Sequence, residues 1–269
     1  IRDYNTFIEL SMEVMPDSLI RRNLNLFFAF QAEDGNIVDG FIPRIKADLD
    51  NVDGYKYRSS NLAPEYVAHK NTVETDHETS LIQAVAKYVR KSGNRDYLRE
   101  KVGDLTVYER MTKAVGFLLT QKMDKKYGLL IGATTVDWGD VQPEHFWGVE
   151  IDENTHYAID IYDNAMFVLA LSDMADMADS EKDKAKWLAL GKKITDKVNE
   201  HLWDKKNRKF YPHIYLNGSP FPESFDENKI YYHGGTAVAA LAGILSDTEI
   251  DYAYRRMLEN QKVAHAQTI

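Results

Sequence analysis

The stretch TDHETSLIQAVAKYVRKSGNRDYL, residues 75–98, is the part of the sequence that decides the fold. After a polar start at Asp76, apolar residues recur at helical spacing from Leu81 to Tyr88. Ser92-Gly93-Asn94 then has the residue types of a helix C-cap, where glycine adopts the left-handed conformation. The stretch therefore predicts one well-delimited helix with a polar first turn.

Helical patterns recur on both sides of this stretch. Pro16-Asp17-Ser18 is typical of a break followed by a new N-cap. We expect further helices at residues 4–15, 19–30, 97–122, 157–177 and 181–202, and a last pair between 234 and about 260. The intervening stretches 33–73, 124–154 and 211–232 carry no helical pattern, and long loops of this kind are often functional. The predicted fold class is all-α.

Composition limits the classes of function. The 269 residues carry a net charge of −9, which argues against nucleic acid or an anionic membrane surface as the main partner and suits a neutral substrate. The absence of cysteine excludes disulfides, thiolate nucleophiles and cysteine-ligated metals. No apolar run approaches the roughly 20 residues that span a membrane, and no signal peptide is visible. We expect a soluble protein, cytoplasmic or exported, of undetermined oligomeric state.

A short internal repeat supports stacked helical hairpins. DKKYG at residues 124–128 returns as DKKNR at residues 204–208, each time after a predicted helix. One hairpin cannot bury its apolar face alone, whereas a ring of hairpins can. Coincidence in a helical protein is the alternative. We expect a single domain over residues 1–269, truncated at both ends, because the chain starts without methionine and ends without a recognisable stop.

The loop GATTVDWGDVQPEHFW, residues 132–147, is the best candidate for chemistry. It combines the carboxylates Asp137, Asp140 and Glu144 with Trp138 and Trp147. Glycoside hydrolysis needs one carboxylic acid to protonate the leaving oxygen and a second carboxylate to activate water or attack directly. Clustered carboxylates and an aromatic wall can both raise the pKa of such an acid. The alternative is an acidic surface loop anchored by tryptophans.

Residues 75–84 and 92–98 resemble the inner-helix region of six-hairpin glycosidases, including the amylo-α-1,6-glucosidase domain of glycogen debranching enzymes. The Trp-x-Asp element of that domain resembles Trp138-Gly139-Asp140, and residues 159–165 stand where the family has an Asn- and aromatic-rich helix start. The order of elements matches over about residues 70–175. The resemblance implies an (α/α)6 toroid, present here as about four helix pairs, that hydrolyses α-linked glycosidic bonds with inversion.

The resemblance also implies roles for particular residues. Asp140 would be the general acid, with Asp137 as the competing candidate. The substrate-binding set would comprise Arg2, Asp3, Asp76, Trp138, Glu144, Trp147, Tyr162, Asn164 and His233. Two alternatives stay open, since Asp76 could be a simple helix cap and Asn164 an ordinary buried polar contact. A lone histidine such as His233 is also more often structural than functional.

The second carboxylate is not assigned by the sequence. The family takes its catalytic base from the last third of the ring, a part with no counterpart here. Glu223, Asp226 and Glu227 lie in the loop at 211–232, but nothing in the sequence marks one of them as the base. No cofactor is expected, except that the spacing of Asp48, Asp50, Asn51 and Asp53 is compatible with calcium ligation through oxygen atoms.

Two rival functions remain open. The first is another carbohydrate enzyme on the same scaffold, a lyase or a phosphorylase, because fold does not fix chemistry. The acidic loop disfavours the acidic substrate of a lyase, and no basic phosphate pocket is visible. The second is a non-catalytic scaffold, which predicts a solvated loop at residues 137–147. The enzyme hypothesis predicts that this loop lines a pocket with Asp76, Asn164 and His233.

Overall fold

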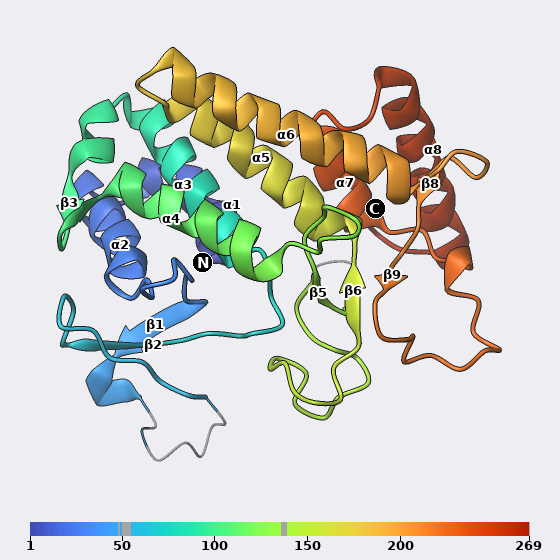
Figure 1. The fold of residues 1–269 in the computed structure, drawn as a ribbon, viewed down its shortest axis with the longest axis horizontal. Coiled ribbons are helices and arrows are strands. Elements are labelled where there is room, and N and C mark those ends of the chain that lie inside the picture. The colour runs from blue at the N-terminus through green and yellow to red at the C-terminus, as the bar shows by residue number, and fades with distance from the viewer. Residues whose placement is uncertain (48, 50–54, 136–138, 269) are drawn as a thin grey trace. The chain divides into compact units, whose positions relative to one another are not determined.

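The computed structural model describes residues 1–47, 49, 55–135 and 139–268 (Figure 1). Over these ranges the chain forms eight α-helices, and its strands are only two to four residues long. The predicted all-α class is therefore confirmed. None of the helices described has both the length and the apolar character that crossing a membrane requires.

The helices are joined by short antiparallel strand pairs. The helices are α1 (Arg2–Val14), α2 (Asp17–Ala29), α3 (His77–Ser92), α4 (Val107–Phe117), α5 (Ile161–Met177), α6 (Glu181–His201), α7 (His233–Leu241) and α8 (Asp247–Ala264). The strands are β1 (Gly40–Pro43), β2 (Tyr66–His69), β3 (Lys101–Val102), β4 (Leu105–Thr106), β5 (Gly132–Ala133), β6 (Tyr157–Ile159), β7 (Trp203–Asp204), β8 (Lys209–Phe210) and β9 (Ile214–Tyr215). The paired strands are β1-β2, β3-β4, β5-β6-β9 and β7-β8.

The chain divides into two compact units. Unit 1 comprises Ile1–Thr72, Asp76–Gln121 and Ser172–Trp187. Unit 2 comprises Val73–Thr75, Lys122–Leu171 and Leu188–Ile269. Helices α5 and α6 each pass from one unit into the other. A single domain over the whole chain stays a prediction.

Helix α3 packs against α1, α2 and α4 in unit 1, and its bounds are those that the sequence predicted. It begins after Asp76 and ends at Gly93, whose φ of 70° is the left-handed conformation expected of this C-cap. Twelve of its residues are buried, so both its apolar and its polar positions lie in the interior. The buried ring of Tyr88 packs edge-on against Tyr97 at 5.1 Å, and its hydroxyl donates to Asp17 Oδ1 at 2.6 Å. This bond ties α3 to the first turn of α2.

The helix predicted at 97–122 was wrong at its start. The chain instead makes a 3-10 turn at Arg95–Arg99 and the β3-β4 hairpin, and α4 begins only after Thr106. Thr106 and Glu109 form a complete capping box, which fixes the helix start there. Gly103 has a φ of 65°, so the hairpin turn uses a conformation that L side chains rarely adopt. Local turn chemistry overrode the apolar periodicity.

The long loop after α2 folds onto α4. It contains the β1-β2 hairpin and no α-helix in its described part, as expected. Gln31 Nε2 donates to the carbonyls of Gly35 and Arg110, at 3.1 and 2.9 Å. Gly35 has a φ of 102°, and a Cβ there would lie 2.2 Å from the carbonyl oxygen of Lys113. Only glycine allows this close approach of loop to helix.

In unit 2 the three-stranded sheet β5-β6-β9 holds the segments between the helices (Figure 1). Gly132, Ala158 and Tyr215 are direct partners across it. The amide of Asn217 extends the ladder, because it accepts from Tyr157 N at 2.7 Å and donates to Thr155 O at 2.9 Å. The sheet therefore joins stretches of chain that are far apart in sequence.

The repeat seen in the sequence is a repeated turn. Asp124 Oδ1 accepts the backbone N–H groups of Lys126 and Tyr127, at 2.8 and 2.7 Å. Asp204 Oδ1 accepts those of Lys206 and Asn207 in the same way, at 2.9 and 3.0 Å. The last residue of each copy has a positive φ, 66° at Gly128 and 53° at Arg208. Both copies follow a helix, so the repeat marks equivalent positions in two hairpins.

Replacing Gly35 by alanine tests the loop–helix approach. Gly35→Ala is expected to destabilise the chain by about 1–3 kcal/mol more than Gly93→Ala, because it adds a steric clash to backbone strain. Gly93 is a matched control, since its φ is also positive but no atom lies within 4 Å of the added Cβ. Urea unfolding of both variants gives the difference. Equal losses would contradict the close packing of Gly35.

The pH dependence of stability tests the environment of Asp173. Burial raises the pKa of Asp173 to about 6, although Arg90 Nη1 lies 2.6 Å away and favours the carboxylate. Because the folded pKa exceeds the unfolded one, this group stabilises the fold most below its unfolded pKa and loses that contribution as pH rises through 6. The side chain of Asp173→Asn stays neutral at every pH. The free energy of unfolding of this variant, relative to that of the parent, should therefore rise by up to about 3 kcal/mol between pH 4 and pH 7.

The measurement is urea unfolding of Asp173→Asn and the parent at four pH values across that range. Asp196→Asn is the control, because Asp196 is exposed and pairs only at the surface with Lys192, at 2.7 Å. Its effect should stay within about 0.5 kcal/mol at each pH. An Asp173→Asn difference that does not change with pH would show that the buried carboxyl titrates normally.

Candidate functional site

The loop that carries Asp140 belongs to unit 2 and begins at the end of β5. Thr134 N donates to the carbonyl of His156 at 2.7 Å, which continues the pairing with the β6 side of the sheet. Thr134 and Thr135 are both buried, so the start of the loop is fixed in the interior. Gly139 is buried with a φ of 71°, and Asp140 directly after it is half-buried. Asp137 and Trp138 lie outside the described residues.

The rest of this loop closes on itself. Gln142 is buried; its N–H donates to Gly148 O at 2.9 Å and its side chain to Glu150 O at 2.8 Å. Val73 N donates to Val149 O at 3.3 Å and fixes the same end. The tip is solvated, since Glu144 is exposed and Trp147 is 42% exposed. The loop therefore combines a fixed base with an exposed tip.

The first turn of α5 is hydrogen-bonded to the segment just before β5. Asn164 is fully buried, and its amide accepts from Leu130 N at 2.8 Å and donates to Leu130 O and Asp160 O at 3.2 and 2.8 Å. These contacts are those of an ordinary buried polar residue, which is the alternative that the sequence left open for Asn164. Tyr162 is buried in the same turn. The roles of both residues as sugar ligands stay predictions.

A buried carboxylate, Asp163, lies on one face of this sheet. A Cβ at Gly132 would be 2.9 Å from Asp163 Oδ2 and 3.3 Å from Thr75 Oγ1. Glycine at this strand position therefore leaves room for the carboxylate against the backbone. Tyr215 is in register with Gly132 across Ala158, so its side chain points to the same face. The sequence did not single out Asp163.

In unit 1 the predicted residues Arg2 and Asp76 form a buried ion pair. Arg2 Nε donates to both carboxylate oxygens of Asp76 at 2.8 Å, and the Asp76 side chain has no exposed surface. Asp76 occupies the N-cap position of α3 but makes no side-chain cap bond, so it is not a simple helix cap. Asp3 is exposed in the first turn of α1. The structure brings together only the first two of these three residues.

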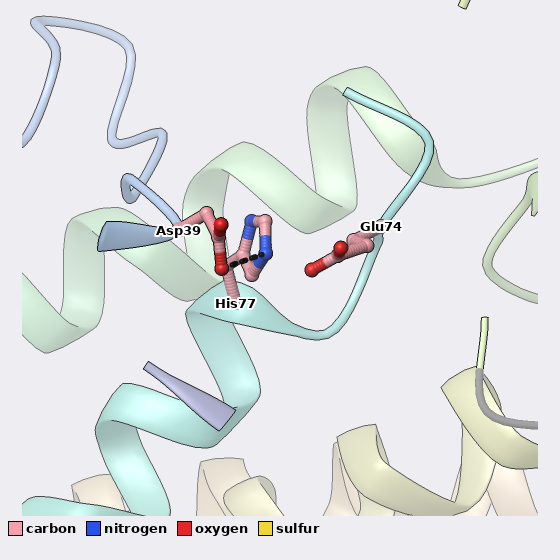
Figure 2. A group of neighbouring side chains, drawn as sticks. All are labelled: Asp39, Glu74 and His77. Carbon is pink, nitrogen blue, oxygen red and sulfur yellow. Dashed lines mark ion pairs between the residues drawn. The ribbon is translucent and has the colours of Figure 1, made fainter. Parts of the chain in front are cut away.

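Further charged groups that the sequence did not single out surround the first turn of α3. Asp39 Oδ1 lies 3.4 Å from His77 Nε2 (Figure 2). Asp39 Oδ2 lies 3.4 Å from His69 Nδ1. Burial raises the pKa of Asp39, but the hydrogen bond and charge of His77 outweigh it, with a smaller contribution from His69, and hold that pKa well below its ordinary value. Glu74, also drawn in Figure 2, belongs to unit 2.

The adjacent Glu78 is a second buried charge in this turn. Its Oε1 accepts from Lys70 Nζ at 3.1 Å and from Ile37 N at 2.7 Å. The side chains of Lys70 and Glu78 are almost fully buried. Their ion pair and the bond from Ile37 N offset the cost of removing the two charges from water. The start of α3 is thus a concentration of buried polar groups that are paired with one another.

The last predicted site residue, His233, starts α7 in unit 2. Its Nε2 lies 3.1 Å from Asn260 Nδ2 on α8, and its ring contacts Tyr231. These contacts hold the two helices of the last hairpin together. The calcium candidates Asp48, Asp50, Asn51 and Asp53 lie outside the described residues, so that hypothesis stays a prediction.

A model of the Glycosyl hydrolase 94 superfamily catalytic domain matches residues 2–263, nearly the whole chain. The chain belongs to this superfamily. The superfamily is one of carbohydrate-active enzymes. Comparison with curated protein sequences gives no match.

Two solved structures share the fold of this chain. This chain is similar to a family GH78 rhamnosidase of Bacillus sp. GL1, with a TM-score of 0.50 and 17% sequence identity. The match covers 70% of this chain and 17% of the rhamnosidase chain. This chain is also similar to a rhamnosidase from Klebsiella oxytoca with rhamnose bound, with a TM-score of 0.56 and 14% identity over 90% and 37% of the two chains. At these identities the likeness shows the fold alone.

These comparisons confirm the predicted six-hairpin, toroid-type fold of the superfamily member. The chain spans well under two thirds of either rhamnosidase. The predicted pocket combines Asp76 of unit 1 with Asp140, Asn164 and His233 of unit 2, and it stays a prediction together with the roles of the individual residues.

The buried Arg2–Asp76 pair gives a test of its structural contribution. Arg2→Met is expected to cost about 3 kcal/mol in the free energy of unfolding, because it removes the guanidinium from a carboxylate that has no exposed surface. Arg256→Met is the control, since Arg256 pairs with Glu259 at the surface and should contribute less than about 1 kcal/mol. Urea unfolding measures both. Equal effects would mean that Asp76 does not depend on Arg2.

Proposed function

We propose that this superfamily member cleaves glycosidic bonds in an oligo- or polysaccharide, with Asp140 as the general acid. The observation that carries the proposal is the setting of Asp140. It is a half-buried carboxylate just past the fixed base of a loop in a chain that matches a glycosidase-type catalytic domain. An acid must be held close to the leaving oxygen to protonate it, and a loop fixed at its base can provide that position.

The acceptor that completes the reaction is either water or phosphate. In hydrolysis a second carboxylate activates water on the opposite face of the sugar. In phosphorolysis inorganic phosphate attacks instead, and the superfamily includes phosphorylases. Attack by water with inversion at an α-linked sugar is our primary proposal, and phosphorolysis is the second candidate. Both use the same proton donor, so both depend on Asp140.

The substrate-binding part of the proposal rests on the polar groups described in each unit. In unit 1, Asp76 orients the guanidinium of Arg2, whose side chain is 14% exposed and is the member of this pair that can reach a hydroxyl group. In unit 2, the exposed Trp147 offers a large aromatic surface of the kind that stacks on sugar rings. No cofactor is required by this chemistry, and calcium at residues 48–53 is retained only as a hypothesis.

The assay is the release of sugar from a panel of α- and β-linked disaccharides, with and without inorganic phosphate. Asp140→Asn is expected to lose at least about a hundredfold in rate on the disaccharide that is cleaved, the scale of general acid catalysis. The same variant should lose much less on the corresponding glycosyl fluoride, whose leaving group needs little protonation. Two free sugars from each disaccharide indicate hydrolysis, whereas one free sugar and one sugar phosphate indicate phosphorolysis.

Glu153→Gln is the matched control and should keep the parent's rate, because Glu153 is exposed between β5 and β6 and is not one of the predicted site residues. An Asp140→Asn variant as active as the parent would eliminate Asp140 as the acid. No release from any disaccharide in either buffer would favour the lyase and scaffold alternatives.

A further inference from the structure

The loop at residues 211–232 contains three acidic residues that the sequence could not distinguish, and the structure separates them. Glu223 and Asp226 are exposed, whereas the side chain of Glu227 is only 14% exposed. Its Oε1 lies 2.6 Å from His213 Nδ1 and accepts from Tyr215 O–H at 2.8 Å. Glu227 is therefore the only one of the three held by buried partners in unit 2.

The pairing with Glu227 fixes the orientation of His213. The His213 side chain is 1% exposed, so water does not compete for its ring nitrogens. A carboxylate only accepts hydrogen bonds, so the ring proton of neutral His213 lies on Nδ1. A buried carboxylate that receives two such bonds keeps both donors in one position, as it does when it orients a catalytic histidine.

The turn that carries Glu227 is itself anchored. Lys209 of β8 is buried, and its ammonium donates to the carbonyls of Asn228 and Ile230, the latter at 2.6 Å. These bonds fix the 3-10 turn at Glu227–Lys229 from outside the Glu227–His213 pair. The position of the Glu227 carboxylate thus follows from the β7-β8 hairpin and does not depend on a ligand.

Tyr232 connects this group to the loop that carries Asp140. Its ring packs edge-on against His213, with centroids 5.5 Å apart and an interplanar angle of 86°. Its hydroxyl donates to the carbonyl of Thr135 at 3.3 Å. Thr135 is buried and is the last described residue before Gly139. Tyr232, which packs on His213, therefore holds the base of the loop that carries Asp140.

We propose that Glu227, His213 and Tyr232 are positioning residues that hold the base of the loop carrying Asp140. Glu227 orients His213, the His213 ring supports Tyr232, and the Tyr232 hydroxyl holds the Thr135 carbonyl. The catalytic consequence rests on the proposed function, because a proton donor displaced by about 1 Å can lose a hundredfold in rate. The mechanical part, that these residues order the loop base, holds without any substrate.

The first experiment is amide hydrogen exchange of the full chain, without substrate, over peptides that cover residues 130–141. Tyr232→Phe removes the hydroxyl and keeps the ring, so these amides should exchange roughly fivefold to tenfold faster, the factor expected for one buried hydrogen bond. Glu227→Gln should give an increase in the same peptides. Exchange across α8, measured in the same samples, should stay at the parent level.

Tyr231→Phe is the matched control. It is the same chemical change at the neighbouring residue, whose ring contacts His233 and not His213. It should leave exchange at residues 130–141 unchanged. Parent-like exchange there in both Tyr232→Phe and Glu227→Gln would overturn the proposal, and so would an equal increase in Tyr231→Phe. If Glu227→Gln does not fold, Tyr215→Phe replaces it, since it removes one bond to the same carboxylate.

The second experiment separates positioning of the acid from a general loss of structure. Tyr232→Phe should slow cleavage of the disaccharide by about tenfold or more, yet change the rate on the glycosyl fluoride less than about twofold. Partial unfolding lowers both rates by the same factor, and that outcome would overturn the positioning role. If the parent cleaves no disaccharide, the proposed function fails, and the exchange experiment alone decides whether these residues hold the loop base.

Discussion

The buried amide of Asn164 is the interaction on which the arrangement of unit 2 depends. It satisfies both backbone groups of Leu130 and the carbonyl of Asp160. An unpaired buried backbone group costs about as much as a lost hydrogen bond, so the segment before β5 and the start of α5 have to meet there. That junction sets the positions of the three-stranded sheet, the base of the loop that carries Asp140 and the first turn of α5. A side chain predicted as a ligand thus has an architectural role.

In unit 1 the start of α3 is also held by buried polar contacts, but these are made by charged groups and not by an amide. Asp76, His77 and Glu78 are each at most 1% exposed, and each is met by an oppositely charged or polar group from a different segment. Replacing buried pairs by apolar residues often improves stability, so such pairs are weak evidence for a purely stabilising purpose. Their concentration at one helix end instead orients the first turn of α3 relative to α1 and to the segments that carry β1 and β2.

The loop at residues 132–147, which carries Asp140, combines two properties. Its tip is solvated, with Phe146 and Trp147 exposed. Its base is buried and hydrogen-bonded through Thr134, Gln142 and Val149. A glycosidase needs both properties, because the proton donor must be fixed while aromatic side chains remain accessible to the sugar.

The sequence by itself determined the helices whose ends carry local signals. The polar start and Gly93 cap of α3, the break at Pro16 and the repeated Asp124 and Asp204 turns all depend on residues close together in the chain. The six-hairpin glycosidase-like fold was also accessible, since the order of short motifs carried the resemblance. The start of α4 was missed because Thr106 and Glu109 compete locally with an apolar periodicity that extends further.

Only the tertiary structure decided which polar residues are buried and what they contact. Glu223, Asp226 and Glu227 are equivalent in sequence, and Glu227 differs only because Lys209, His213 and Tyr215 come from other elements. Asp163 is buried next to Gly132 for the same reason. Helix caps are short-range, so the sequence encodes them directly. Burial and pairing are long-range, so they emerge only when the sheet and helices bring distant residues together.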